Sequence, residues 1–135
     1  MVARQSADGR IIQRPYTPQN TAIYEGIIRS AAVEAMGERL PLTGPVVMVV
    51  LVILPIPSSW SKRRQQAAAS GALWPAKKPD LTNVLKAIED ACNRVVFADD
   101  AQIVEVQIRK RFGFRPRVVV VVREAESEGA GDPPA

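Results

Sequence analysis

The stretch that decides the fold is Val46-Val47-Met48-Val49-Val50-Leu51-Val52-Ile53-Leu54, an apolar run that is followed by Pro55 and Pro57. Its many β-branched side chains favour a strand over a helix. Because apolar residues occupy both alternating positions, we expect both faces of this strand to be covered, as in the centre of a sheet. The run is also too short for a membrane-spanning helix, which needs about 20 residues.

Further strands and helices are expected on either side of this strand. Ile103–Arg111 alternates in polarity, which indicates a strand with one wet face, and Val118–Val122 is again fully apolar. Val95–Phe97 has the composition of a short strand. Helices are expected from Thr17-Pro18 to a stop at Gly37, over Ser58–Ala69 up to the break at Ser70-Gly71, and over Leu81–Cys92. These elements predict a mixed α+β fold, a small central sheet with helices packed on it.

The 135 residues divide into one domain and two flanking segments. Residues 1–16 are polar and are expected to form a loose N-terminal arm. Residues 17–123 form the domain, which is long enough to bury one hydrophobic core. Residues 124–135 are acidic and contain Gly and Pro, so we expect a disordered tail.

Charge points to a polyanionic partner. The net charge is +4, but four of the 14 acidic residues follow Arg123, so residues 1–123 carry 18 basic and 10 acidic side chains, or about +8. A compact basic body attracts phosphate backbones. General solubility is the alternative explanation.

Missing residue types narrow the chemistry. The chain has no histidine, which excludes Ser–His and Cys–His nucleophiles and His-ligated zinc. No Gly-rich nucleotide-binding motif occurs. Carboxylates, lysines and a hard metal ion remain. The single cysteine, Cys92, excludes an internal disulfide, and no signal peptide is visible, so a cytoplasmic location is expected.

The helix over Leu81–Cys92 has two unlike faces. Its apolar residues fall within an arc of about 100°, and Asp80, Asn83, Lys86 and Asp90 cluster on the opposite side. The polar side is either a solvated face capped by Asp80 or part of a site. Asp99-Asp100 is likewise either a turn or a source of metal ligands. A helix followed by a returning strand can bring Asp100 beside Asp80, which would create a Mg²⁺ site.

Two blocks of the sequence resemble a known family. The first is Lys78-Pro79-Asp80-Leu81-Thr82-Asn83-Val84-Leu85-Lys86-Ala87-Ile88-Glu89-Asp90-Ala91, which is similar to the signature KPDxDNxxKAxxDA. The second is Val96-Phe97-Ala98-Asp99-Asp100-Ala101-Gln102-Ile103-Val104, which is similar to a hydrophobic stretch followed by DD-x-Q-[IV]. Weaker similarity extends to Tyr16-Thr17-Pro18 and to Ser59–Arg64. Over about residues 14–123 the chain resembles the RusA family of Holliday junction resolvases.

The resemblance implies a Mg²⁺-dependent homodimeric endonuclease that nicks four-way junctions and other branched DNA in recombination and repair, with Mn²⁺ as a possible substitute. It implies that Asp80 and Asp100 are catalytic, metal-binding carboxylates and that Lys86 is catalytic. Asp99 is a further candidate metal ligand, which could substitute for the carboxylate that the signature has at position 82. Candidate DNA contacts are Lys62, Arg63, Arg64, Lys77, Lys78, Asn83, Arg109, Lys110 and Arg111, although each basic group is also explained as ordinary surface charge. Trp60 and Trp74 either stack on unpaired bases or, as we favour, pack in the fold.

The chain departs from the family pattern in two places. Thr82 stands where the signature has a second Asp, and a hydroxyl is a poorer Mg²⁺ ligand than a carboxylate. Residues 1–14 are expected to be too short and polar for the family's N-terminal strand. A catalytically weakened, structure-selective DNA-binding relative and a metal-dependent nuclease of broader specificity therefore remain as alternatives.

Overall fold

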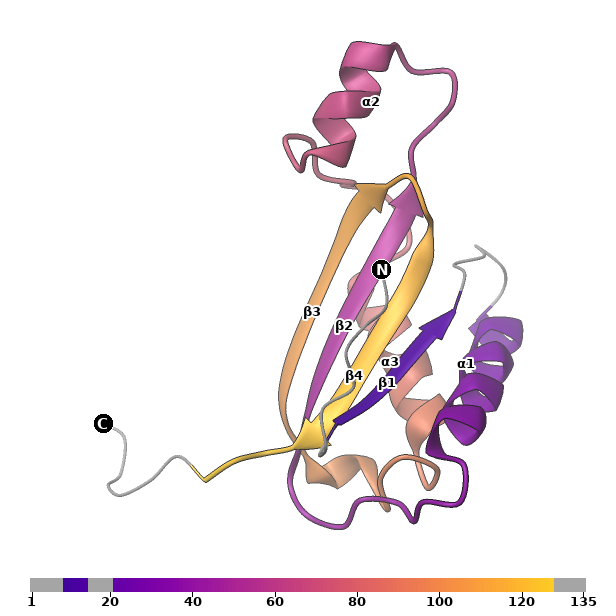
Figure 1. Cartoon of the computed structure of the whole chain (residues 1–135), viewed down its shortest axis with the longest axis vertical. Helices are drawn as coiled ribbons and strands as arrows, with labels where there is room; N and C mark the ends of the chain where they lie inside the picture. Colours follow the sequence, from indigo (N-terminus) through magenta and orange to yellow (C-terminus); the bar gives the residue numbers. More distant parts are fainter. Residues whose placement is uncertain (1–8, 15–20, 128–135) are drawn as a thin grey trace.

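The computed structural model describes residues 9–14 and 21–127, and Figure 1 draws the remaining residues in grey. The helix-start signal Thr17-Pro18, most of the N-terminal arm and the end of the acidic tail lie outside the described residues. The elements follow in the order β1 (Gly9–Arg14), α1 (Thr21–Met36), β2 (Val46–Pro55), α2 (Lys62–Ala69), α3 (Leu81–Cys92), the 3₁₀ turn η1 (Asp100–Gln102), β3 (Ile103–Gly113) and β4 (Arg117–Glu124).

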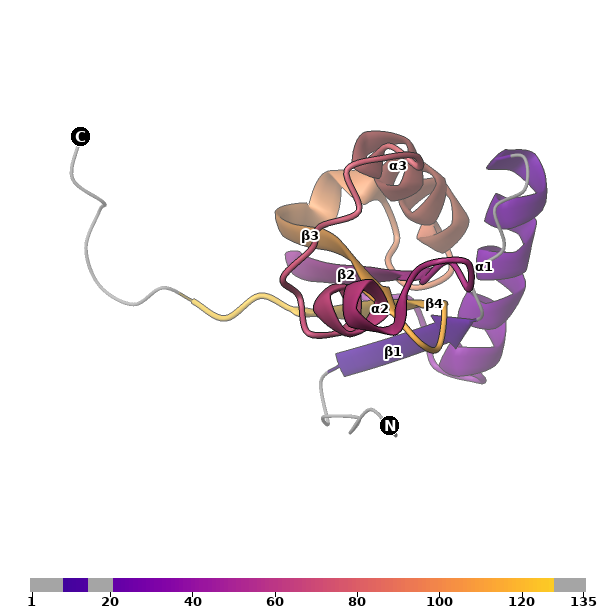
Figure 2. The same cartoon turned by 90° about the horizontal axis from the view of Figure 1, so that it is seen from above.

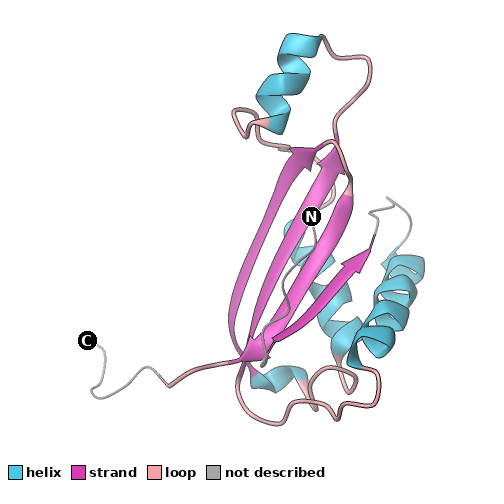
Figure 3. Ribbon diagram, in the orientation of Figure 1, coloured by secondary structure: helices cyan, strands magenta, loops and turns pink. Residues whose placement is uncertain are grey.

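The described strands form one mixed sheet in the order β1-β4-β2-β3. β2 pairs in parallel with β3 and antiparallel with β4, so the expected central strand is confirmed. The segment between β2 and β3 carries α2, which lies beyond the end of the sheet, and α3, which packs on it (Figures 1 and 3). This is the predicted α+β class, a small sheet with helices packed on it.

One face of the sheet is covered by α1 and α3, which lie against each other (Figure 2). The core between them contains Met48, Val50 and Val52 of β2 and residues of both helices such as Ile28 and Ile88. Val49 and Leu51, which alternate with these core residues on β2, are only half-buried. Val47 and Ile53 on this second face are buried, so the expectation that both faces of β2 are covered is met only in part. α1 and α3 both pack on the first face (Figure 2).

The N-terminal region contains a strand that the sequence did not predict. Gly9–Arg14 pairs antiparallel with β4 along its whole length, from Gly9 opposite Arg123 to Arg14 opposite Val118. Ile12 is buried in the core, and Arg14 forms a salt bridge with Glu34 of α1. The expected loose arm over residues 1–16 is therefore wrong for residues 9–14, which close one edge of the sheet.

The helix boundaries follow local signals. α1 ends at Met36, and Gly37 follows with a φ of 57°, the left-handed conformation that favours glycine. Ser61 caps α2, because its side chain accepts a hydrogen bond from the backbone N–H of Arg64 at 3.2 Å. α3 has the predicted bounds. The expected strand at Val95–Phe97 is reduced to isolated bridges formed by the fully buried Phe97.

Candidate nuclease site

Asp80 stands at the N-terminus of α3 with an unengaged carboxylate. It occupies the N-cap position, but its side chain makes no capping hydrogen bond, and the residue is exposed. A capping Asp normally accepts a hydrogen bond from the first turn. Asp80 therefore does not cap the helix through its side chain, as the explanation of a solvated, capped helix face requires. Its carboxylate oxygens face solvent.

Lys110 of β3 holds the loop that presents Asp80. Its ammonium group donates to the carbonyl oxygens of Lys77 and of Pro79, the latter at 3.0 Å. Lys110 is half-buried, on the same face of the sheet as α3. Its ammonium group thus holds the backbone before Asp80, which favours a positioning role for Lys110. Its role as a DNA contact stays a prediction.

The polar face of α3 is exposed as predicted. Thr82, Asn83, Lys86 and Asp90 are all exposed, while Val84, Ala87, Ile88, Ala91 and Cys92 are buried against the sheet and α1. The apolar periodicity gives α3 a single buried stripe, and this stripe fixes which side chains point outward. Asp80 and Lys86 therefore belong to one accessible surface.

The two adjacent aspartates have different structural roles. The carboxylate of Asp99 accepts a hydrogen bond from the backbone N–H of Ala101 at 3.0 Å and caps η1. Gln102 completes this capping box, because its side-chain oxygen accepts from the N–H of Asp99 at 2.7 Å. The side-chain amide of Gln102 donates to the carbonyls of Leu42 and Gly44 and ties the turn to the preceding loop. Asp99 is therefore engaged in the turn, whereas Asp100 is exposed beside it.

Asp100 lies near the C-terminal half of α3. The pKa of Glu89 is raised, first by partial burial of its carboxyl group and then by the nearby charges of Asp100 and Asp90, against a lowering by Lys86. The carboxyl group of Glu89 is thus within electrostatic reach of Asp100, and sequence reasoning did not single out Glu89. The available signal was its place in the motif, one residue before Asp90.

Asp80 and Asp100 do not meet within one chain. Glu89, which interacts with Asp100, is nine residues beyond Asp80 on α3, and a helix rises about 1.5 Å per residue, which gives about 14 Å. The length of β3 also separates the two aspartates. Asp100 precedes the first residue of β3, whereas Lys110, which donates a hydrogen bond to Pro79, is near the last residue of the strand. The expected juxtaposition is wrong for a single copy. In the described part of the chain no three acidic, cysteine or histidine side chains gather closely enough to hold a metal ion.

The candidate DNA-binding residues lie in separate regions. Lys62, Arg63 and Arg64 are exposed on α2, and Lys77 and Lys78 are exposed in the loop before α3. Arg109 and Arg111 alternate with Lys110 on β3, and they are exposed on the face of the sheet that α3 does not cover. The α2 and loop groups are near the Asp80 end of α3, whereas the two arginines of β3 face the other way.

Comparison with known proteins shows the family to which the chain belongs. The profile of the family described as "Endodeoxyribonuclease RusA" matches residues 3–123, and these include both carboxylate blocks. The chain is 40% identical over 88 residues to a Bacillus subtilis (strain 168) protein that is called "Uncharacterized protein YqaN". That match covers 64% of this chain and 62% of YqaN, so it spans about three fifths of the relative's length. No helix in the described ranges is both long and apolar enough to cross a membrane. The protein belongs to the RusA family of endodeoxyribonucleases.

Proposed function

We propose that this protein is a Mg²⁺-dependent endonuclease that acts as a homodimer and nicks four-way junctions and other branched DNA. The observation that carries the proposal is the family match over residues 3–123, within which Asp80, Lys86 and Asp100 are all exposed. Junction resolution would place the protein in DNA recombination and repair. The basic side chains of α2 and of the loop before α3 supply phosphate contacts near Asp80.

In this proposal the metal site requires a second copy of the chain. Carboxylate oxygens suit Mg²⁺, but Asp80 is at one end of α3, whereas Asp100 is in electrostatic reach of Glu89 near the other end. In two helices that pack antiparallel about a two-fold axis, the N-terminal end of each lies beside the C-terminal half of the other. Such a dimer would join Asp80 of one copy to Asp100 of the second and create two equivalent sites. Two sites related by a two-fold axis match the symmetric nicking of a four-way junction.

Surface composition supports self-association on this side of the molecule. α1 packs along α3 and, among its described side chains, leaves the large apolar groups of Ile27 and Val33 exposed to solvent. Exposed apolar groups beside a polar patch are typical of interfaces with a hydrophobic core and a polar rim. A second copy that covers them would stabilise the paired arrangement of the α3 helices.

Asp80, Asp100 and Lys86 have distinct tasks in this scheme. Bound Mg²⁺ supplies Lewis-acid stabilisation of the phosphate and activation of a water molecule. Asp80 and Asp100 would hold the ion and fix its position relative to the scissile bond. Lys86 lies between the two ends of the helix, close enough to Glu89 to lower its pKa. Its ammonium group would offset the charge that develops on the phosphoryl oxygens or protonate the leaving oxygen.

The test is Mg²⁺-dependent nicking of a labelled synthetic four-way junction, with a duplex of equal length and an RNA junction as competitors. Asp100→Asn should abolish nicking and leave junction affinity unchanged or higher, because it removes a negative charge near the phosphates. Glu34→Gln is the matched control, since Glu34 is exposed on α1 and bonded to Arg14, and it should cut normally. Binding without Mg²⁺-dependent cutting by the wild type would favour the DNA-binding alternative, and equal cutting of all three substrates would favour a general nuclease.

A further inference from the structure

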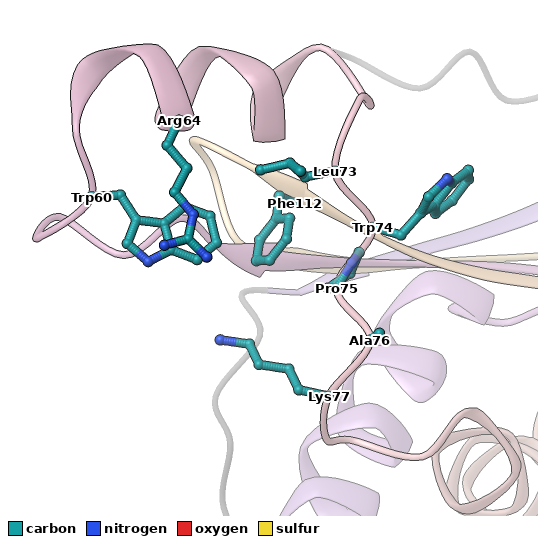
Figure 4. A pocket seen from close by; sticks show the side chains of 8 residues that line it. All are labelled: Trp60, Arg64, Leu73, Trp74, Pro75, Ala76, Lys77 and Phe112. Carbon is teal, nitrogen blue, oxygen red and sulfur yellow. The ribbon is translucent and has the colours of Figure 1, made fainter.

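A small aromatic pocket lies at the α2 end of the sheet, and part of its lining comes from the loop that leads to Asp80 (Figure 4). Its volume is about 230 Å³, below the roughly 300–1,000 Å³ of sites for whole small-molecule ligands. It therefore suits one planar group rather than a complete cofactor. The lining combines aromatic rings, aliphatic side chains and two cations, and it includes Trp60, Arg64, Trp74, Lys77 and Phe112.

One wall of the pocket is fixed by packing. Trp60 meets the buried Phe112 edge to face, with ring centroids 5.3 Å apart and an interplanar angle of 69°. The guanidinium carbon of Arg64 lies 3.8 Å from the centroid of the Trp60 ring. Gln65 also donates a hydrogen bond to the Trp60 carbonyl at 2.8 Å. The packing interpretation of the tryptophans therefore holds for Trp60.

The other wall is open. Trp74 is 64% exposed and extends from its loop on the side of Phe112 away from Trp60 (Figure 4). Burial therefore does not explain Trp74, although packing was the favoured interpretation of both tryptophans. An indole that is this exposed offers a stacking platform.

Charge around the pocket suits a nucleotide. Lys77 lies with its ammonium group 5.7 Å from the Phe112 centroid, and it precedes Asp80 by three residues. Arg64 is also exposed, and both charged groups lie on the Trp60 side of Phe112, across the pocket from the indole of Trp74 (Figure 4). Two cations on this side would attract the phosphates of a nucleotide whose base enters the pocket, and aromatic rings interleaved with cations are typical of sites for single-stranded nucleic acid.

We infer that this pocket receives one unpaired nucleobase of the branched DNA and thereby sets where the strand lies relative to Asp80. The inference rests on the proposed function and adds a subsite to it. Regular duplex DNA keeps its bases stacked and paired, so it cannot fill the pocket without unstacking. The pocket would therefore contribute to the choice of branched over duplex DNA.

Tryptophan emission tests the pocket directly, because both tryptophans of the chain line it. The wild-type protein is titrated with a four-way junction in the absence of divalent metal, and separately with a duplex of the same length at saturating concentration. Stacking of a base should quench the emission with the junction and not with the duplex. Junction binding in a gel-shift assay without any change of emission, or equal quenching by both DNAs, would overturn the inference.

Substitution of Trp74 gives a second, independent measurement. Trp74→Ala should weaken junction binding by at least about 5-fold, the lower end of the loss expected for one stacked base, and leave duplex binding unchanged. Trp74→Phe should recover most of that loss. Leu40→Ala is the matched control, because Leu40 is 83% exposed and precedes the opposite end of β2. Equal junction affinity of Trp74→Ala and wild type would refute the subsite. If the wild type still showed normal Mg²⁺-dependent nicking, the proposed function would remain intact. A wild type that neither binds nor cuts junctions would refute both.

Discussion

Replacing Lys110 by methionine tests whether this residue positions the Asp80 loop or contacts DNA. Lys110→Met keeps the apolar stem and removes the donors to the carbonyls of Lys77 and Pro79. A hydrogen bond from a charged group contributes about 1.5–3 kcal/mol, but Lys110 is half-buried and water can reach the freed carbonyls. We therefore expect a total loss of about 1–2 kcal/mol in the free energy of unfolding. Because small misplacements of a catalytic group can cost on the order of 100-fold in rate, nicking should fall at least about 10-fold.

The assays are urea unfolding, junction nicking and the dependence of junction affinity on salt. The control is Arg109→Met, since Arg109 is exposed on the opposite face of β3 and should change stability by less than about 0.5 kcal/mol. Loss of a phosphate contact would reduce the slope of log affinity against log salt by about 0.9, and we expect no such change for Lys110→Met. Unchanged stability together with a shallower salt slope would refute the positioning role.

Four further predictions address the metal shell, the sheet, helix α1 and the thiol. Thr82→Asp should lower the Mg²⁺ concentration that gives half-maximal nicking, and an unchanged midpoint and maximum rate would show that position 82 lies outside the metal shell. Gly113→Ala should destabilise the protein by about 1–3 kcal/mol in urea unfolding, because the new Cβ would lie 2.5 Å from Cγ2 of Ile53. Gly26→Ala, with open space at its Cβ in α1, should instead stabilise it by about 0.5–1 kcal/mol. Burial raises the pKa of the Cys92 thiol to about 12, so a thiol reagent at pH 8 should modify it slowly in the native protein and rapidly in urea.

The sequence predicted the strongest elements and missed the weakest. The bounds of α3 follow from a complete apolar stripe from Leu81 to Cys92, and β2 from its Val-rich run. β1 was missed because Gly9–Arg14 is short and polar, and its strand conformation depends on hydrogen bonds to β4. The sequence also did not predict that the second face of β2 is only partly covered. Apolar side chains on both faces show where burial is favourable, but they do not show which segment or which copy of the chain covers them.

The candidate site was predicted in its residues and not in its geometry. The motif identified Asp80, Lys86 and Asp100, and the structure exposes all of them. The spacing between Asp80 and Asp100 in the sequence allows the two carboxylates to lie together or at opposite ends of a helix. Only the direction of α3 relative to β3 decides between these two arrangements. The sequence likewise could not distinguish Asp99, whose side chain caps η1, from Asp100, whose side chain takes no part in that capping box.

Mixing two inactive variants tests the shared metal site most directly. Asp80→Asn and Asp100→Asn should each fail to nick a four-way junction. After the two are mixed and allowed to exchange subunits, each heterodimer would hold one site with both substitutions and one site with neither. We predict that nicking returns in the mixture, up to about a quarter of the wild-type rate if exchange is random and the two sites act independently. No recovery of nicking, with heterodimers demonstrated by differently tagged copies, would contradict a site assembled from Asp80 of one copy and Asp100 of the other.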